Sequence, residues 1–484
     1  MGEGNTKGYS VSGSPTDHGP RTTNPQHTMK NRTQYVCQQC GHSSAKWVGK
    51  CPACQEWNTF VEEKIAPPRL APGPVSDSVP IRYDALEGED VPRMLTGILE
   101  FDRVLGGGVV AGALTLLGGD PGVGKSTLML AVAARLATRQ PILYASGEES
   151  PRQIKLRGDR MKIETGDLHI YSEMSIERIL SAAEALGVGA VIVDSIQTTF
   201  SEKLDMPPGS IGQVREVASQ FLFWTKKRNV PVFLIGHITK EGALAGPKAL
   251  EHIVDTVLYF EGPRQHPHRI VRTIKNRFGA ANELGIFEMS PDGLRPVDNP
   301  SGLFLSGTGR MDAGSAVVCS VEGSRPLLIE LQALVSRTHF GTPRRLTTGV
   351  DPQRLALLAA VIENRLGLNL WEHDIYLNVV GGLQVDEPAA DLAIVGSIIS
   401  SLLNRPLPAS TVVFGEVGLG GEIRSCLHPE MRLKEARSLG FERAVVPVQE
   451  KSGGPAGVDR LEVSDLHQAL EALFGPGASN SSQD

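Results

Sequence analysis

The sequence predicts an α/β protein whose main domain is built on a parallel β-sheet, and three observations support this prediction. First, a glycine-rich turn at 119–126 lies between the apolar run 113–118 and a run of helix-forming residues. Second, further apolar runs end in acidic or polar residues, as buried parallel strands do where they reach a ligand-binding edge. Third, two closely spaced pairs of cysteines precede this region. The sequence therefore predicts a small metal-bound module followed by a strand–turn–helix core.

Length and composition limit the classes of protein to consider. The 484 residues are enough for two or three domains, and a hydrophobic content of 40% is enough to fill their cores. The net charge of −6 excludes a globally basic nucleic-acid binder, so any DNA- or RNA-binding surface must be local. The chain has no run of about 18 apolar residues and no apolar signal core at its start. We therefore expect a cytoplasmic protein with no membrane partner.

Both ends of the chain, residues 1–34 and 476–484, are predicted to be disordered tails. The first 30 residues are rich in Gly, Ser, Thr, Pro and Asn and show no hydrophobic periodicity. We expect either that Met29 is the natural start or that residues 1–28 are dispensable. The segment 65–80 contains five prolines and is predicted to be a stiff, extended linker.

Four of the six cysteines form two C-x-x-C pairs, and they are Cys37, Cys40, Cys51 and Cys54. Four thiolates at this spacing can surround one Zn²⁺ tetrahedrally. A module as small as residues 35–64 cannot fold on apolar burial alone, so the metal supplies folding free energy. The alternative is two redox pairs, but no βαβ pattern surrounds them. We expect a closed, structural zinc finger, and we expect Cys319 and Cys426 to be core residues.

The glycine-rich turn has the spacing of a Walker A phosphate loop. Glycines let backbone N–H groups close around a phosphate, and the start of the following helix adds partial positive charge. Lys125 is expected to reach the β- and γ-phosphates of ATP, and Ser126 is expected to hold Mg²⁺. The alternative is a chance glycine-rich turn, which the flanking strand and helix patterns disfavour. The predicted nucleotide-binding residues are Gly119, Asp120, Pro121, Gly122, Val123, Gly124, Lys125, Ser126 and Thr127.

Two predicted strands end next to carboxylates that suit ATP hydrolysis. The run 141–145 precedes Glu148 and Glu149, and Glu148 is our candidate to polarise the attacking water. The alternative is that these glutamates cap the next helix, which we prefer for Glu149. The run 190–194 ends in Asp194, a Walker B pattern that places a carboxylate beside Mg²⁺ through water. This pattern is weak alone and gains weight from the phosphate loop upstream.

A further strand is predicted at 231–236, and it is followed by His237, a candidate sensor of the γ-phosphate of ATP. A single histidine is as often a satisfied core or surface residue, so both interpretations stay open. Two loops, 198–210 and 240–248, leave the same edge of the sheet. They are expected to be mobile, and both are candidates to contact a polyanion.

An edge strand is predicted at 269–275, and it leads into Lys275 and Arg277. These cations belong either to a solvated turn or to an arginine finger that reaches the γ-phosphate in a neighbouring subunit. Upstream of the phosphate loop, residues 97–108 are predicted to form a short helix and a turn.

These motifs together resemble the bacterial RadA (Sms) family of DNA repair and recombination ATPases, from about residue 35 to the C-terminus. The segments that carry the resemblance are the four-cysteine module, the RecA-type loop 119–126, Lys275-Asn-Arg-Phe-Gly279, Gly236-His-Ile-Thr-Lys240, Leu244-Ala-Gly-Pro-Lys248, Asn378-Val-Val-Gly-Gly382 and Phe414-Gly-Glu-Val-Gly418. The resemblance implies a RecA-like ATPase domain at 81–295 within a homo-hexameric ring. It also implies binding of single-stranded and branched DNA, and branch migration with the RecA recombinase.

The resemblance also implies roles that the residues alone leave open. Lys275 and Arg277 are implied to act in trans, at the interface with the next subunit. The loops after Asp194 and His237 match the positions of the DNA-binding loops of RecA. The catalytic set is then Glu148, Lys125, Asp194, Lys275 and Arg277, with ATP, Mg²⁺ and Zn²⁺ as cofactors.

Residues 296–475 resemble the Lon protease domain. A Lon-type protease needs a serine nucleophile and a lysine base, but these positions fall on Ala389 and near Glu430. We therefore expect a non-proteolytic α/β scaffold that assists ring assembly and DNA contact. A local basic cluster in this domain is either a phosphate-binding patch or a solvated surface. Its members are Arg337, Arg344 and Arg345.

The leading hypothesis is a DNA-dependent ATPase of helicase or translocase type that hydrolyses ATP at subunit interfaces. Ala389 argues against a protease. A RecA-fold kinase shares the phosphate loop, but it has no reason to carry a zinc module and a Lon-like domain. An adaptor that uses ATP only for assembly stays open, and DNA-stimulated turnover is the observation that argues against it.

Overall fold

The computed structural model describes residues 32–37, 42–52, 55–65, 82–85, 92–237, 250–262, 267–306, 312–338, 341–448 and 457–476. The chain divides into two compact units, one of Met1–Cys37 and His42–Ile81 and the other of Gln38–Gly41 and Arg82–Asp484. The expectations for residues 1–31, 66–80, 240–248 and 477–484 lie outside the described residues. No helix in the described part of the chain is long and apolar enough to cross a membrane.

The smaller unit contains an antiparallel three-stranded sheet with the order β2-β1-β3. Its strands are β1 (Arg32–Cys37), β2 (Ser43–Ser44) and β3 (Phe60–Ile65). β1 pairs with β3 along its whole length, from Arg32 opposite Ile65 to Cys37 opposite Phe60. Residues 32–34, which we expected in the tail, are therefore part of the sheet, because β3 supplies their hydrogen-bond partners.

The larger unit contains a nine-stranded sheet with the order β14-β13-β12-β11-β6-β10-β9-β7-β8. Its parallel strands are β6 (Leu114–Gly119), β7 (Ile142–Ser146), β8 (Leu168–Tyr171), β9 (Ala190–Asp194), β10 (Val232–Ile235) and β11 (Thr256–Glu261). The sequence predicted β6, β7, β9 and β10, because each is a continuous apolar run that is buried on both faces. β6 pairs with β10 and β11, so the phosphate loop leaves the middle of the sheet.

Three antiparallel strands extend this sheet beyond β11, and they are β12 (His268–Asn276), β13 (Leu284–Ser290) and β14 (Gly293–Pro296). The prediction that β12 is an edge strand was wrong. β12 pairs with β11 on one side and with β13 on the other. Its side chains alternate between buried and half-buried because one face of the sheet is incompletely covered here.

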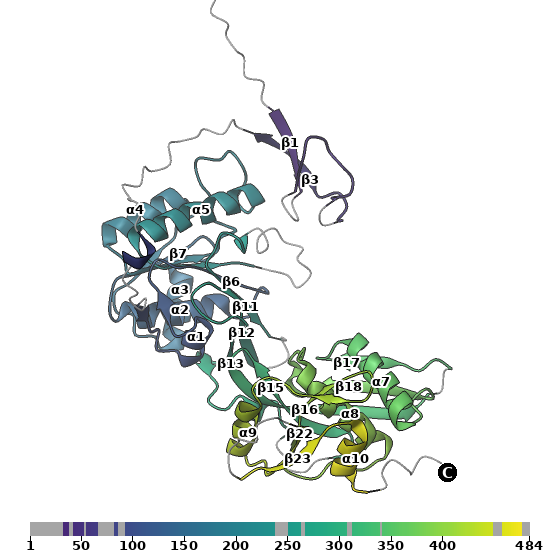
Figure 1. Ribbon diagram of the computed structural model, residues 1–484. Helices are drawn as coiled ribbons and strands as arrows, with labels where there is room; N and C mark the ends of the chain where they lie inside the picture. Colours follow the sequence, from purple (N-terminus) through teal and green to yellow (C-terminus); the bar gives the residue numbers. More distant parts are fainter. Residues whose placement is uncertain are drawn as a thin grey trace, which may run out of the picture. The chain divides into compact units, whose positions relative to one another are not determined.

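Helices cover both faces of the parallel part of the sheet (Figure 1). α1 (Leu99–Val104), α2 (Lys125–Ala137) and α3 (Pro151–Met161) contribute to the core on one face. α4 (Ile176–Leu186) and α5 (Ile211–Arg228) contribute to the core on the other face. Successive strand residues point to opposite faces, so Leu117 packs in the first core and Leu116 in the second. α1 is the short helix that the sequence predicted, and the short strands β4 (Arg93–Met94) and β5 (Val109–Val110) pair beside it.

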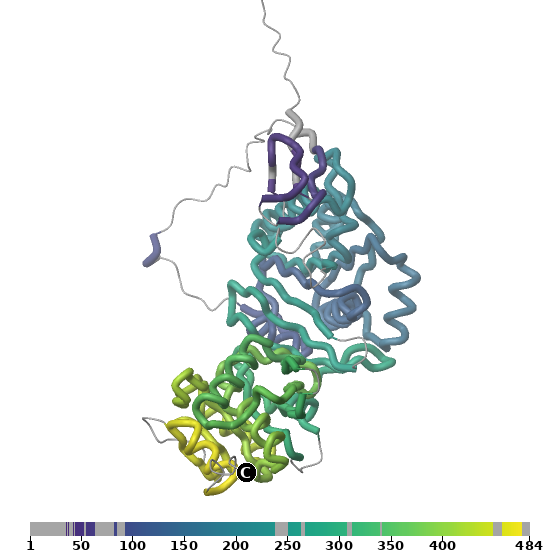
Figure 2. The backbone as a smooth tube through the Cα atoms, turned by 90° about the vertical axis from the view of Figure 1, so that its right-hand side faces the viewer, coloured from purple at the N-terminus to yellow at the C-terminus, as the bar shows by residue number. Residues whose placement is uncertain are grey.

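The C-terminal part, green to yellow in Figure 2, has a mixed seven-stranded sheet of its own with the order β17-β18-β16-β15-β19-β22-β23. Its strands are β15 (Ser315–Glu322), β16 (Arg325–Arg337), β17 (Arg345–Thr348), β18 (His373–Val379), β19 (Thr411–Val413), β22 (Arg443–Pro447) and β23 (Asp459–Val463). Its helices are α7 (Pro352–Leu366), α8 (Asp391–Leu402), α9 (Pro429–Ser438) and α10 (Leu466–Phe474). The buried helix α8 packs against β15 and β16 and fills the centre of the core.

The two parts of the larger unit share a core across the domain boundary that we expected at residue 295. Leu284 and Ile286 of β13 belong to the same buried cluster as the C-terminal sheet. Glu100 of α1 is 5% exposed, accepts a hydrogen bond from the Ile286 N–H at 2.8 Å and pairs with Arg325 of β16. A buried carboxylate needs such partners, so this contact ties the two parts together.

Candidate nucleotide-binding site

The phosphate loop connects the end of β6 to the start of α2 and depends on its glycines. A Cβ atom at Gly119 would lie 2.2 Å from the carbonyl oxygen of Phe260, so no larger residue fits. Gly124 is the N-cap of α2 with a φ of 118°, and no side chain caps the helix. A Cβ at Gly122 would meet open space. The start of α2 therefore presents backbone N–H groups and partial positive charge to an anion.

Lys125 is held inside this loop by backbone oxygens. Its ammonium nitrogen donates to the carbonyl oxygens of Gly119 at 2.7 Å and Asp120 at 2.9 Å. Burial lowers the pKa of Lys125 to about 8, against the opposing effect of the carboxylates of Asp194 and Glu148. The residue is 4% exposed, so these backbone oxygens and His237 are the partners that a phosphate would have to replace.

Glu148 lies beyond the end of β7 and faces the same place. Its Oε1 atom lies 3.0 Å from His237 Nε2 and accepts a hydrogen bond from the Ser195 hydroxyl. The hydrogen bond with His237 is the main cause that lowers the pKa of Glu148, with further help from Ser195 and Lys125. Glu148 is therefore a charged carboxylate in position to orient or deprotonate a water molecule.

Glu149 has a different role from the one we expected. Its side chain pairs with Arg157 of α3 and makes no helix cap. Ser150 is the N-cap of α3, and it forms a capping box with Gln153. The prediction that Glu149 caps this helix was wrong, because a serine at the next position offers the shorter side chain that the cap geometry favours.

Asp194 at the end of β9 is almost fully buried, at 1% exposed. Its Oδ2 atom accepts a hydrogen bond from the Tyr144 hydroxyl at 2.7 Å, whereas its Oδ1 atom has no hydrogen-bond partner among the described residues. Burial raises the pKa of Asp194, and the nearby hydroxyl groups of Tyr144 and Ser126 oppose this shift. A buried, unpartnered carboxylate oxygen beside the Ser126 hydroxyl fits a Mg²⁺ ion, which prefers oxygen ligands and bound water.

His237 joins Lys125 to Glu148. Its Nδ1 atom lies 3.2 Å from Lys125 Nζ, and its Nε2 atom faces Glu148. The backbone oxygen of His237 accepts a hydrogen bond from the Gln197 side chain at 3.2 Å. The structure thus brings together four of the residues that the sequence selected separately, namely Lys125, Glu148, Asp194 and His237.

Lys275 and Arg277 lie elsewhere, at the opposite end of the strands. Lys275 pairs with Val257 at the start of β11, which in turn pairs with Leu116 near the start of β6. The phosphate loop begins at the other end of β6, beyond Gly119. These two cations therefore cannot serve the phosphate loop of their own chain.

The loop that carries these cations is anchored within the chain. The Lys275 ammonium donates to the carbonyl oxygen of Val254 at 2.9 Å, and Arg277 Nη1 lies 3.3 Å from Asp255 Oδ1. Asn276 donates to the Leu105 carbonyl oxygen at 3.2 Å and accepts from a backbone N–H two residues later at 3.0 Å. A buried carboxylate and a side-chain amide thus define the shape of the loop.

The loop 198–210, which we expected to be mobile, is held by hydrogen bonds to a side chain of α5. Gln213 of α5 is fully buried, and the two N–H groups of its amide nitrogen are shared among the carbonyl oxygens of Ser201, Leu204 and Met206 at 2.9–3.2 Å. Three backbone acceptors on one amide hold the first half of the loop in a compact shape.

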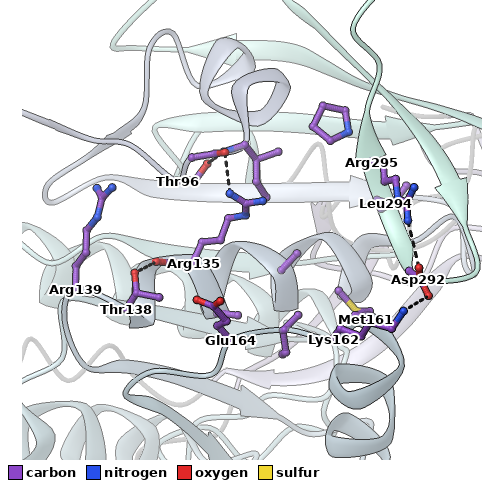
Figure 3. A pocket seen from close by; sticks show the side chains of 16 residues that line it. Thr96, Arg135, Thr138, Arg139, Met161, Lys162, Glu164, Asp292, Leu294 and Arg295 are labelled. Carbon is purple, nitrogen blue, oxygen red and sulfur yellow. Dashed lines mark hydrogen bonds and ion pairs between the residues drawn. The ribbon is translucent and has the colours of Figure 1, made fainter.

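A pocket of about 790 Å³ lies along the second half of α2, away from the phosphate loop (Figure 3). Its cations already have partners in the chain. Arg135 donates to the carbonyl oxygen of Gly97, and Asp292 pairs with both Lys162 and Arg295. This pocket is therefore separate from the candidate nucleotide site at the phosphate loop.

In the smaller unit, Cys37 and Cys51 are both fully buried. The Cys37 N–H donates to the carbonyl oxygen of His42, and the Gln55 N–H donates to that of Cys51, so each thiol sits at a tight turn. Cys40 and Cys54 lie outside the described residues. Cys37 and Cys51 are two of the four expected ligands of the zinc ion, and their burial at two turns is consistent with a tetrahedral zinc site.

The structure places both residues that the resemblance aligned with the serine and lysine of a Lon-type protease. Ala389 is buried in the short 3₁₀-helix η4 (Pro388–Ala390), and Glu430 is exposed on α9, 3.6 Å from Arg460. Sequence analysis missed a nearby buried pair. Arg432 is fully buried and pairs with Glu387, and its Nη1 atom lies 2.9 Å from Glu387 Oε2.

The three arginines of the predicted basic cluster do lie close together. Arg337 pairs with His373 across two strands, and the N–H of Arg344 donates to Asp374 at 2.8 Å. The guanidinium of Arg345 is bound to the carbonyl oxygens of residues 370 and 373. Arg337 and Arg344 are exposed, so two of the three side chains face solvent.

Two family models match the chain. Residues 35–62 match the model described as rubredoxin metal binding domain, and residues 93–243 match the model described as AAA domain. The first match includes all four cysteines of the C-x-x-C pairs, and the second includes the phosphate loop, Glu148, Asp194 and His237.

Curated proteins named DNA repair protein RadA are similar over most of this chain. The protein of Bacillus subtilis (strain 168) is 48% identical over 455 residues, which are 92% of this chain and 99% of the relative. The protein of Pseudomonas aeruginosa is 46% identical over 450 residues, with 92% and 99% covered, and that of Aquifex aeolicus is 45% identical over 445 residues, with 92% and 100% covered. A solved KaiC-like protein from Pyrococcus horikoshii OT3 aligns with a TM-score of 0.36 at 22% identity, over 43% of this chain and 100% of that one.

Proposed function

The chain belongs to the RadA family of DNA repair proteins, and from this premise we propose that it hydrolyses ATP at the interfaces of a homo-hexameric ring that moves on single-stranded DNA. Family membership supports the role in DNA repair, and the AAA domain supports the use of ATP. The observation that carries the rest of the proposal is the position of Lys275 and Arg277 at the opposite end of the sheet from their own phosphate loop.

In the proposed reaction, Lys125 leaves its carbonyl partners and binds the β- and γ-phosphates of ATP. Glu148 accepts a proton from a water molecule while the water oxygen bonds to the γ-phosphorus and the bond to the β–γ bridging oxygen breaks. The products are ADP and phosphate. Ser126 and Asp194 would hold Mg²⁺, which neutralises charge on the phosphates. His237 senses the γ-phosphate because it touches both Lys125 and Glu148.

The cations at the other end of the sheet complete the site of a neighbouring subunit. The four residue steps of β6 from Thr115 to Gly119 span about 13 Å, which is more than an arginine side chain can bridge within its own chain. In a ring, the amino ends of the strands in one subunit can face the phosphate loop of the next subunit. Arg277 is then within reach of the nucleotide bound there. Arg277 then supplies positive charge to the transition state in trans.

DNA contact is proposed for the loops that follow Asp194 and His237, because both leave the carboxyl ends of strands beside the nucleotide site. Loss of the γ-phosphate can then move these loops through His237. The proposal includes branched DNA as substrate, the RecA recombinase as partner and a structural Zn²⁺ on the four cysteines. The C-terminal part serves as a non-proteolytic scaffold, since a methyl group at Ala389 cannot attack a carbonyl.

The test uses two inactive variants and their mixture. Lys125→Ala is expected to lose nucleotide binding and hydrolysis, and Arg277→Ala is expected to bind ATP but turn over at least 100-fold more slowly, as arginine-finger variants do. Mixed rings contain some interfaces with an intact Lys125 and an intact Arg277, so mixing should restore part of the activity.

Two results contradict the proposal. One is a mixture that recovers no activity at any ratio while both variants still form rings by electron microscopy. The other is wild-type turnover that single-stranded DNA does not stimulate, which favours an adaptor that uses ATP only for assembly. Phosphorylated protein after incubation with labelled ATP favours a kinase.

A further inference from the structure

Tyr144 is a buried residue of β7 that contacts Asp194 but has no role in the proposed reaction. It is the only aromatic residue of the strand and is fully buried in the core formed with α2. β7 and β9 are neighbours, and Tyr144 stands opposite Ile192, two residues before Asp194. Its hydroxyl reaches along the sheet and donates to Asp194 Oδ2 at 2.7 Å.

This hydrogen bond makes the two oxygens of Asp194 different. Oδ2 is occupied by the Tyr144 hydroxyl, whereas Oδ1 is buried and has no hydrogen-bond partner in the part of the chain that the structure describes. An unpartnered buried carboxylate oxygen costs free energy, and such atoms in proteins generally serve a ligand or an ion. The Ser126 hydroxyl interacts with the same carboxylate, so the site lies at the start of α2.

A carboxylate that ends a strand can rotate about its terminal bonds, and the orientation of metal-binding carboxylates is commonly set by a second hydrogen bond. Among the described residues, the Tyr144 hydroxyl is the group that fixes Asp194 from the core side. Its ring is packed on all sides, so the hydroxyl position is well defined. A buried donor therefore holds one oxygen of the Asp194 carboxylate and leaves the other oxygen without a partner among the described residues.

We infer that Tyr144 is a positioning residue for the magnesium site: it holds Asp194 Oδ2 so that Oδ1 faces the water shell of the Mg²⁺ ion bound with the nucleotide. This inference rests on the proposed function, in which Asp194 and Ser126 hold that ion. Tyr144 touches neither the nucleotide nor the metal and acts only through Asp194.

The test is Tyr144→Phe in the full-length, zinc-loaded protein, with a fluorescent N-methylanthraniloyl-ADP as probe. Its affinity is measured in EDTA and at increasing MgCl₂. Without Mg²⁺, the variant should bind the probe as the wild type does. The tightening by Mg²⁺ should fall about tenfold, and the Mg²⁺ concentration for half-maximal binding should rise by a similar factor, as when a group that orients a metal ligand is removed.

The matched control is Tyr171→Phe on the neighbouring strand β8. Tyr171 is half-buried in the core with α4 and α5, and its hydroxyl makes no hydrogen bond among the described residues. This variant should respond to Mg²⁺ as the wild type does. A double variant tests the route of action: in an Asp194→Asn background, Tyr144→Phe should change nothing further, since the two residues act as one unit.

Each result decides a different question. If wild-type affinity does not depend on Mg²⁺ at all, the proposed function of Asp194 fails, and this inference fails with it. If the wild type responds and Tyr144→Phe responds equally, only the inference is overturned. If Tyr144→Phe weakens binding in EDTA as much as in MgCl₂, or adds to the effect of Asp194→Asn, Tyr144 has a general structural role and the inference is also overturned.

Discussion

His237 Nδ1 lies 3.2 Å from the ammonium nitrogen of Lys125. An ammonium group only donates hydrogen bonds, so Lys125 donates in this contact and Nδ1 is the atom that faces it. The Nε2 atom lies 3.0 Å from Glu148 Oε1, so one ring contacts the residue expected to bind phosphate and the residue expected to activate water. If Lys125 moves to bind a nucleotide, it no longer contacts His237. The imidazole of His237 then keeps only its contact with Glu148. We propose on this basis that His237 couples nucleotide binding to the position of Glu148.

The first prediction concerns His237→Ala. Hydrolysis in a single turnover should fall about 100-fold, because Glu148 loses the partner that orients it. Nucleotide affinity should stay equal or become tighter, because Lys125 loses a competing partner. Stopped-flow binding and quenched-flow hydrolysis measure the two quantities separately. His252→Ala, at an exposed histidine, is the control and should change neither. Equal losses in binding and hydrolysis would show that His237 only supports the fold of the loop.

The second prediction concerns Asn276, which bonds the Leu105 carbonyl oxygen and the Phe278 N–H. Asn276→Ala removes these two bonds and a third from the Thr256 hydroxyl, and it frees the loop that carries Arg277. A displacement of about 1 Å can cost about 100-fold in rate, so turnover in assembled rings should fall by about 10- to 100-fold. Nucleotide affinity should not change, because the phosphate loop of the same chain is remote. Asn364→Ala on the exposed face of α7 is the control, and a normal rate for Asn276→Ala would contradict the prediction.

The sequence predicted the strands of the site well and their neighbours less well. β9 could be predicted because a buried parallel strand is apolar on both faces and its end is marked by Asp194. Whether a strand such as β12 lies at an edge depends on strands that come later in the chain, and its alternating pattern does not distinguish an edge from a half-covered face. The antiparallel partners β13 and β14 decide this and leave no signal within β12 itself.

The site residues that sequence analysis missed are those whose meaning depends on a distant partner. From the sequence, Tyr144 cannot be distinguished from the other apolar residues of its strand. Its hydrogen bond to Asp194, which lies 50 residues later, is visible only in the structure. Glu387 and Arg432 are separated by 45 residues and have no shared motif. One amino-acid sequence shows the types of such residues but not which of them contact each other, so the tertiary structure is needed to recognise the pairs.

The third prediction concerns removal of zinc. One Zn²⁺ per chain should be released by a strong chelator, with loss of the sheet at residues 32–65, because metal binding supplies the folding free energy of a module this small. Hydrogen exchange should rise at β1 and β3. The fluorescence of Trp47 and Trp57 should change. Nucleotide affinity should be retained, since the phosphate loop belongs to the other compact unit. Protein that carries no zinc, or chelation that leaves β1 protected, contradicts the prediction.

The fourth prediction concerns pH and Glu330. Burial alone would raise the pKa of this 4% exposed carboxyl, but hydrogen bonds from Ser306 and Gln332 outweigh burial and lower the pKa below its usual 4.5. A lowered folded-state pKa means that the unfolded state binds more protons, so the contribution is present above about pH 4.5 and is lost as pH falls through the folded pKa. Glu330→Gln should destabilise by about 1–3 kcal/mol near neutral pH. The difference between the variant and the wild type should shrink toward pH 4 in urea titrations, and a constant difference argues against an ionised Glu330.

The last prediction concerns the buried pair Glu387–Arg432. Arg432 is fully buried, and Glu387 also accepts hydrogen bonds from the Ser320 hydroxyl and the Val321 N–H. Arg432→Met should cost about 3 kcal/mol, because it leaves the Glu387 carboxylate, which is only 20% exposed, without its counter-ion. Replacing both residues with apolar ones of similar volume should cost less than the single change, since no uncompensated charge remains.

Hydrogen exchange of β15 and the urea midpoint of the C-terminal part measure these effects. The control is Arg424→Met, at an exposed arginine that pairs with Glu422, which should cost less than about 1 kcal/mol. Nucleotide affinity should be unchanged in all these variants, because the pair is remote from the phosphate loop. If the double variant proves less stable than Arg432→Met alone, the pair contributes more to stability than the burial of its charges costs, which contradicts the prediction.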